Sequence, residues 1–239
     1  MRYAPLMGLA ALAFGFAAAP AAVPSASAGE VVLGGVGLGG TFRVPARTMH
    51  EAKFATVFRQ QHDFSCGSAA LASLLTYHYG IERGELDVFS SMYEHGDRAR
   101  IERLGFSLLD MKQYLARLGI GSDGYRVPLE RLATARLPTI ALIDSDGYRH
   151  FVLVKGLDAK TVLVGDPARG LRRIPHDEFK AMWNGIAFVI TDDIPIGQAS
   201  FNRDPEWELL PPGAPLGKAL PRTALATFTA SLYRAGNTW

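Results

Sequence analysis

The chain has 239 residues, of which 48% are hydrophobic and 20% are charged, and its formal net charge is +2. These proportions are typical of a globular protein, and the length suffices for one domain with a sizeable core. A net charge this small, without a run of Lys or Arg, argues against a nucleic-acid partner.

The N-terminus predicts an export signal. Residues 6–23 are almost wholly apolar and rich in alanine, and Ala26-Ser27-Ala28 fits a signal-peptidase cleavage site. Prolines interrupt the apolar run, which is short for a membrane anchor. We therefore predict that residues 1–28 are a signal peptide cleaved after Ala28, that the mature protein has no membrane span, and that it is periplasmic or secreted.

A glycine-rich arm is predicted over residues 29–52. Its glycines disfavour helix, so we expect a flexible arm or an irregular edge strand. The arm contains two glycine pairs, Gly34-Gly35 and Gly39-Gly40.

The predicted folded domain spans residues 53–191 and begins with helices. Asp63 or Ser65 can cap a helix that carries apolar residues at helical spacing and ends at Gly80. Further helix is expected within residues 85–120, and one short helix is expected over residues 129–135.

Strands are predicted to follow the helices. Apolar runs separated by turn residues predict strands over residues 139–144, 150–156, 161–165, 171–174 and 186–190, with a short helix near residues 178–183. Helices followed by an antiparallel meander indicate the α+β class. Residues 192–239 are rich in proline, and we expect them to form an extension that wraps the domain or docks a partner.

Cys66 is the only cysteine of the chain, so it cannot form an intrachain disulfide. A lone exported cysteine is an inert buried thiol, a site for intermolecular pairing or a nucleophile. Its expected place at a helix N-terminus favours the nucleophile, because the helix dipole stabilises a thiolate there. The small residues 67–70 are expected to leave room for a substrate backbone.

A thiol nucleophile needs a general base and a group that orients the base. If the hairpin turns at residues 158–160, His150 lies opposite residue 168, and Asp166 lies one diagonal step away on the same face. That geometry favours His150 over the other five histidines. Gln60 and Gln61 are both available upstream to donate a hydrogen bond to an oxyanion.

Three motifs together resemble a known family. They are Gln60-x-x-x-x-x-Cys66-Gly67-x-Ala69-Ala70, His150-Phe151-Val152-Leu153-Val154 and Gly165-Asp166-Pro167-x-x-Gly170. They resemble the peptidase C39 family, which are papain-like cysteine peptidases best known as the leader-cleaving domains of bacteriocin exporters. The resemblance covers about residues 53–190.

This resemblance implies a papain-like α+β fold with N-terminal helices packed on an antiparallel sheet. It implies Cys66 as nucleophile, His150 as general base and acid, Asp166 as the orienting residue and Gln60 as oxyanion donor. It also implies cleavage after a Gly-Gly pair. The sequence has no H-E-x-x-H motif and no cysteine pair that would indicate zinc, and we expect no cofactor.

The predicted signal peptide makes the chain similar to freestanding exported members that accompany secretion systems, including functional-amyloid export. The expected substrate is therefore an exported, glycine-rich polypeptide, and a component of a secretion system is a further candidate partner. Two alternatives stay open at this point. One is a catalytically silent peptide-binding or chaperone module, and the other is a thiol transpeptidase.

Overall fold

The structure, a computed structural model, describes residues 30–34, 41–45, 48–145 and 147–210. The predicted signal peptide and residues 211–239 of the predicted extension lie outside the described residues. The chain divides into two units, residues 1–46 and 47–239. In the first unit, strands β1 (Glu30–Gly34) and β2 (Thr41–Pro45) pair in antiparallel fashion, with Gly34 opposite Thr41.

The second unit has helices and then strands along the chain, as predicted. The helices are α1 (Met49–Lys53), α2 (Cys66–Tyr79), α3 (Glu85–His95), α4 (Arg98–Leu104), α5 (Leu108–Arg117), α6 (Leu129–Ala135), α7 (His176–Met182), α8 (Ile194–Ser200) and α9 (Asp204–Glu208). The strands are β3 (Ser122–Arg126), β4 (Thr139–Ser145), β5 (Tyr148–Leu157), β6 (Thr161–Asp166), β7 (Gly170–Pro175) and β8 (Trp183–Ile190). The α+β class is confirmed.

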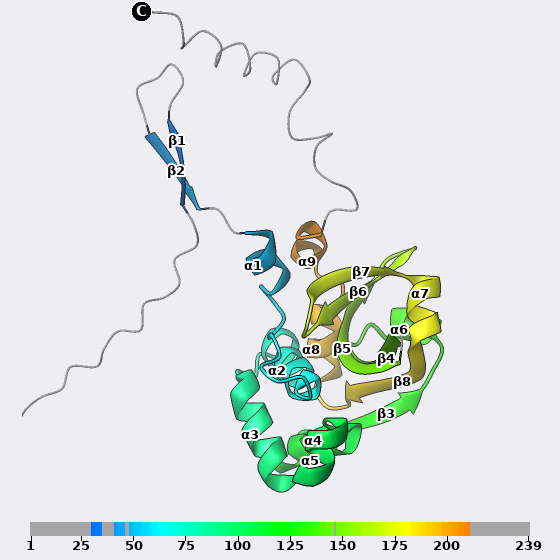
Figure 1. The fold of residues 1–239 in the computed structure, drawn as a ribbon. Helices are drawn as coiled ribbons and strands as arrows, with labels where there is room; N and C mark the ends of the chain where they lie inside the picture. Colours follow the sequence, from blue (N-terminus) through cyan, green and yellow to red (C-terminus); the bar gives the residue numbers. More distant parts are fainter. Residues whose placement is uncertain (1–29, 35–40, 46–47, 146, 211–239) are drawn as a thin grey trace, which may run out of the picture. The chain divides into compact units, whose positions relative to one another are not determined.

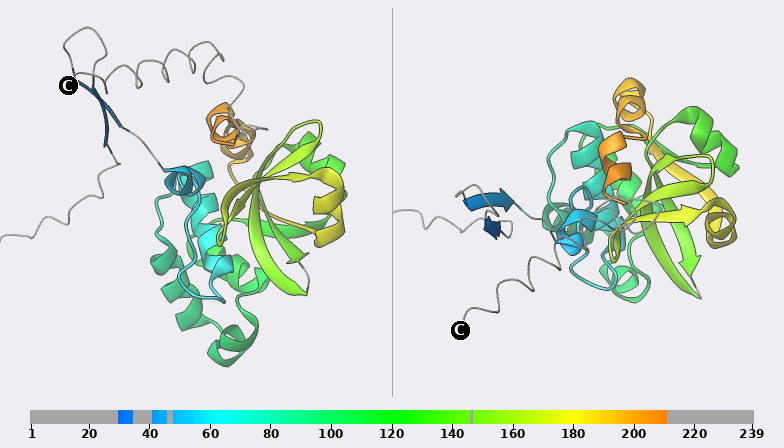
Figure 2. Two further views of the ribbon diagram at one scale, coloured as in Figure 1. Left: turned by 45° about the horizontal axis from the view of Figure 1, so that its top comes forward. Right: turned by 90° about the horizontal axis from the view of Figure 1, so that it is seen from above.

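The six strands of this unit form one curled antiparallel sheet in the order β3-β8-β4-β5-β6-β7 (Figure 1). One core lies between α2 and its neighbouring helices and one face of the sheet, where Phe151 and Leu153 of β5 are buried. The other face, with Val152 and Val154, packs against α6 and α7. Figure 2 shows the helices on both sides of the sheet. Alternate residues of β5 thus enter different cores, as the pleat of a strand requires.

Helix α2 lies in the centre of this unit and begins at the predicted nucleophile. Its residues are apolar or small nearly all round, and most of them are buried. The helix ends where expected, at Gly80, whose φ of 68° is left-handed. The helix therefore carries Cys66 at its first residue, within reach of the sheet.

Three features differ from the predicted elements. The predicted arm, residues 29–52, contains the paired strands β1 and β2 and most of helix α1, where no helix was expected. Strand β3 was not foreseen, because it is a largely exposed edge strand without apolar alternation. Helices α8 and α9 lie within the proline-rich stretch and pack on the same unit; for example, His78 Nδ1 of α2 lies 3.0 Å from Ser200 Oγ of α8. Proline occurs only in the first turn of each of these helices, where its missing N–H costs no hydrogen bond.

Candidate active site

Cys66 is the first residue of α2, and its exposed fraction is 7%. Ser65 holds the N-cap position, but its hydroxyl accepts hydrogen bonds from the backbone N–H of Gln61 (3.2 Å) and His62 (3.1 Å) in the preceding loop. Ser65 therefore does not cap the first turn of α2 with its side chain. The partial positive charge of the helix end remains available to a thiolate or an oxyanion.

The small residues after Cys66 serve packing and not substrate access, so that expectation was wrong. A Cβ at Gly67 would lie 2.8 Å from Met111 Cε and 3.0 Å from Phe106 Cβ. Residues 68–70 are fully buried. Small side chains are needed here because α2 runs through the middle of the fold and its neighbours approach closely.

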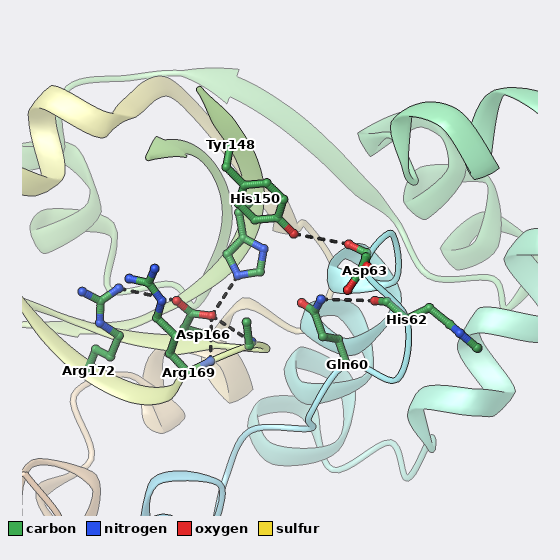
Figure 3. Close-up of polar contacts among 9 residues, drawn as sticks. Gln60, His62, Asp63, Tyr148, His150, Asp166, Arg169 and Arg172 are labelled. Carbon is green, nitrogen blue, oxygen red and sulfur yellow. Dashed lines mark hydrogen bonds and ion pairs between the residues drawn. The ribbon is translucent and has the colours of Figure 1, made fainter. Parts of the chain in front are cut away.

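His150 and Asp166 meet in a buried contact. His150 Nε2 lies 2.8 Å from Asp166 Oδ1, and both side chains are almost inaccessible to solvent (Figure 3). The second ring nitrogen, Nδ1, makes no hydrogen bond of ordinary geometry with any described residue. This nitrogen is the one left for proton exchange with the thiol.

The charge state of His150 depends on opposing effects. Burial lowers the pKa of His150, but the hydrogen bond with Asp166 and the neighbouring Cys66 outweigh burial and raise it to about 9. Burial raises the pKa of Asp166, but bonds to His150 and to backbone N–H groups hold it below its ordinary value. At neutral pH the pair is therefore an imidazolium next to a carboxylate.

Asp166 is itself fixed by the turn that follows β6. The backbone N–H groups of Ala168 (2.9 Å) and Arg169 (3.1 Å) donate to Asp166 Oδ1. Arg172 Nη1 of β7 lies 3.5 Å from Asp166 Oδ2. Gly170 closes the turn with a φ of 77°, which favours glycine. The carboxylate thus keeps one orientation toward His150.

Gln60 lies in the loop before α2, opposite the sheet (Figure 3). Its backbone N–H donates to the carbonyl of Pro167 at 3.0 Å, which joins this loop to the Asp166 turn. Its side-chain Nε2 donates to the carbonyl of His62 at 3.1 Å, and the same amide also interacts with the Tyr148 hydroxyl. Gln61 is exposed, so the structure favours Gln60 of the two candidates.

Tyr148 is a residue of this site that the sequence analysis did not identify. Its ring stacks on His150, with ring centroids 5.7 Å apart, and its hydroxyl donates to the carbonyl of Asp63 at 3.3 Å (Figure 3). It therefore crosses from the sheet to the loop before α2. The available signal was its position two residues before His150, which places both side chains on one face of the strand.

Two cavities are lined in part by the candidate catalytic residues. A groove of about 460 Å³ begins at Cys66 and is lined mainly by apolar side chains of α4, α5 and the sheet, among them Leu104, Leu108, Leu109, Phe151 and Ile186. A smaller, more polar cavity of about 190 Å³ touches His150 and Asp166 and includes Arg169 and Arg172. One cavity thus adjoins the candidate nucleophile, and the other adjoins the candidate base.

The other histidines have no such arrangement. His78 is buried, but its partner is the Ser200 hydroxyl and not a carboxylate. Burial together with Lys155 and Arg203 holds the pKa of His78 well below its ordinary value. A neutral histidine without an acidic partner is poorly suited to activate the thiol.

Residues 55–193 match the model of the Peptidase C39 family. The "Probable functional amyloid protease FapD" of Pseudomonas fluorescens is 35% identical over 68% of this chain and 72% of its own length. The protein of the same description from Pseudomonas aeruginosa is 38% identical over 74% of this chain and 75% of its own length.

Among solved structures, a double glycine motif protease from an AMS/PCAT transporter, in complex with the leader peptide, is 27% identical. That match covers 56% of this chain and 89% of the other, with a TM-score of 0.47.

Proposed function

Because this chain belongs to the peptidase C39 family and is a cysteine protease, we propose that Cys66, His150 and Asp166 are its catalytic triad. The observation that carries the proposal is the buried 2.8 Å contact between His150 and Asp166. The imidazole of His150 also interacts with the thiol of Cys66 at the start of α2. A nucleophile, a base and a group that orients the base are the parts that thiol catalysis needs.

The reaction follows from these positions. The imidazolium of His150 and the N-terminus of α2 both favour the thiolate of Cys66, which attacks the carbonyl carbon of the scissile bond. The Cys66 backbone N–H and the Gln60 amide donate to the oxyanion that forms. His150 then gives its proton to the leaving amine, which leaves a thioester on Cys66.

Water completes the cycle. His150, now neutral, takes a proton from a water molecule that attacks the thioester carbonyl. The second oxyanion collapses with release of a carboxylic acid, which loses its proton to the solvent, and the thiolate–imidazolium pair is restored. Asp166 holds the ring throughout, so that Nδ1 is presented to the thiol and to the water.

The proposed substrate is a polypeptide with a pair of small residues at the cleavage site. The thiol is only 7% exposed, and Tyr148 crosses next to the imidazole, so approach to Cys66 is narrow. A Gly-Gly pair has no side chains to clash in such a passage. The apolar groove that begins at Cys66 suits an apolar stretch of the same substrate.

We further propose that the protein acts after export. The predicted signal peptide supports this, with cleavage after Ala28 and a periplasmic or secreted mature protein. Of the described helices, none has the length and hydropathy needed to cross a bilayer. The relatives from Pseudomonas are described as probable functional amyloid proteases, which supports an amyloid-forming polypeptide as substrate. In keeping with export of this chain, the proposed polypeptide is exported and glycine-rich.

Peptide cleavage by purified protein tests the proposal. A peptide with a central Gly-Gly pair should be cut after the second glycine, and a matched peptide with Val-Val should stay intact. We expect Cys66→Ala and His150→Ala to abolish cutting, because each removes a group that forms or breaks a bond. Undiminished cleavage by either variant would refute the triad. Mass spectrometry of the products separates hydrolysis from transfer to an amine, and absence of any product in the wild type would favour the silent binding module.

A further inference from the structure

The pairing of β5 with β6 changes register by one residue. Near the turn, Leu157 pairs with Val162 and Gly156 with Leu163. Beyond the irregularity, Val154 pairs with Val164 and Leu153 with Gly165. Lys155 is therefore an extra residue in β5, which is the definition of a β-bulge.

The bulge decides which face of the sheet His150 occupies relative to Asp166. Leu153 is opposite Gly165, and continuing this register by one residue places Asp166 opposite Val152, two residues from His150 and hence on the same face. Without the extra residue, the pairing next to the turn would continue and Asp166 would lie opposite Leu153. His150 and Asp166 would then point to opposite faces of the sheet, because a slip of one residue reverses every side chain of one strand relative to the other.

Asn202, in the loop between α8 and α9, holds the bulge from outside the hairpin. Its side-chain Oδ1 accepts from Leu157 N–H at 2.7 Å, and its Nδ2 donates to the Leu157 carbonyl at 2.9 Å. Its backbone N–H donates to the Lys155 carbonyl at 3.0 Å. The approach is close: a Cβ at Gly156 would lie 2.1 Å from Asn202 Oδ1. Asn202 thus pairs with the backbone of the extra residue, Lys155, and with the backbone of Leu157 on the turn side of it.

The Lys155 side chain is fixed by the same segment. Lys155 is fully buried, and its Nζ lies 2.9 Å from Glu206 Oε1 of α9 and 2.9 Å from the carbonyl of Thr56. Glu206 is buried as well. A buried ammonium without its carboxylate is strongly unfavourable, so the pair favours the conformation in which Lys155 is the extra residue.

We propose that the segment after the family-matched residues 55–193, through Asn202 and Glu206, positions His150 for its contact with Asp166 by holding the bulge at Lys155. The inference rests on the proposed function in that it takes His150 and Asp166 as the catalytic pair. Asn202 and Glu206 touch neither of them and act through the strand. The α8–α9 segment is then part of the catalytic apparatus.

Replacement of Asn202 tests the proposal in the whole mature protein. Asn202→Gly removes the two side-chain bonds and still permits the observed φ of 60°. NMR titration of the labelled histidines should give a His150 pKa of about 9 in the wild type. In Asn202→Gly we expect it to fall toward about 6.5, the ordinary value. We expect kcat for the Gly-Gly peptide to fall about 100-fold while KM changes little, because the acid–base group is misplaced.

Two controls separate positioning from general destabilisation. Gln198→Ala removes a 3.0 Å hydrogen bond from α8 to the Ala135 carbonyl, away from the bulge. Leu132→Ala lowers stability by opening a cavity at α6. Both should keep the wild-type titration of His150. If Asn202→Gly does not fold, Asn202→Asp, which keeps the acceptor and loses the donor, is measured in the same way.

The outcomes are distinct. Wild-type His150 titration and kcat in the folded Asn202 variant would overturn the proposal. A shifted His150 titration in a protein whose wild type cuts no peptide would support the positioning role and would refute the proposed function instead.

Discussion

At the scale of single residues, the chemistry depends on where one proton resides. Burial alone would leave His150 neutral, and a neutral imidazole could not hold a thiolate beside it. Asp166 and Cys66 reverse that preference and raise the pKa of His150 to about 9. The imidazolium therefore persists through neutral pH.

Asp166→Asn tests this balance. The substitution keeps the size of the side chain and removes its charge, so the His150 pKa should fall from about 9 toward the ordinary 6.5. The alkaline limb of kcat/KM should move to lower pH by a similar amount, and kcat/KM at pH 7 should fall about 10²- to 10⁴-fold. Asp123→Asn, at an exposed carboxylate, is the matched control. An unchanged alkaline limb in Asp166→Asn would show that His150 is not the group that titrates.

The free energy of unfolding should depend on pH through the same pair, His150 and Asp166. The folded-state pKa of His150 is raised, so its stabilising contribution is fully present below about pH 6.5. That contribution is lost as the pH rises through about 9. Urea unfolding of the wild type at pH 6 and pH 10 should show this loss, and Asp166→Asn should show much less of it.

At the scale of elements, helices α4 and α5 present an apolar surface to the groove at Cys66. Leu104 and Leu109 line this groove and are 76% and 61% exposed. Large apolar side chains left in solvent beside a nucleophile are typical of a surface that binds a partner. We interpret this surface as the binding site for an apolar part of the substrate.

Leu109→Gln should therefore weaken substrate binding. Loss of apolar contact in such a groove is worth about tenfold in KM, with little change in kcat because the triad is untouched. Leu86→Gln is the matched control, since Leu86 of α3 is 52% exposed and does not line the groove. Equal KM values for the two variants would contradict a role of this groove in binding.

Sequence patterns predicted the elements better than the details of their pairing. The hairpin of β5 and β6 follows from two apolar runs around a turn, and it correctly placed His150 and Asp166 on one face. The predicted pairing at the turn differed by one residue, and the bulge at Lys155 restored the register. A bulge held by Asn202 far along the chain leaves no local pattern. For the same reason, the contacts of Tyr148 with Asp63 and of Arg172 with Asp166 could not be foreseen.

At the scale of the whole molecule, the compact unit continues past the family-matched residues. Helices α8 and α9 pack on α2 and on the β5–β6 hairpin, so they contribute to the same fold. The proline content of residues 192–239 predicted an extension, which for residues 211–239 stays a prediction. It could not indicate that helices α8 and α9 contact the domain. Those contacts depend on tertiary structure that composition does not encode.

The proposed export predicts the residue at which the mature protein begins. Mass spectrometry of the exported protein should show a chain that begins at Gly29, because the cleavage site ends at Ala28. The Cys66→Ala variant should have the same N-terminus. Retention of residues 1–28 would contradict the signal peptide. A shorter chain in the wild type alone would show that the protein cleaves its own arm at a glycine pair.

The central claim is that Cys66 forms a covalent acyl-enzyme. Acid-quenched reactions with a Gly-Gly peptide, analysed by intact mass, test it most directly. We predict a transient adduct on Cys66 that adds the mass of the N-terminal product less one water, is released by hydroxylamine and is absent in Cys66→Ala. Peptide cleavage without any adduct on Cys66, or with equal speed in Cys66→Ala, would contradict the account.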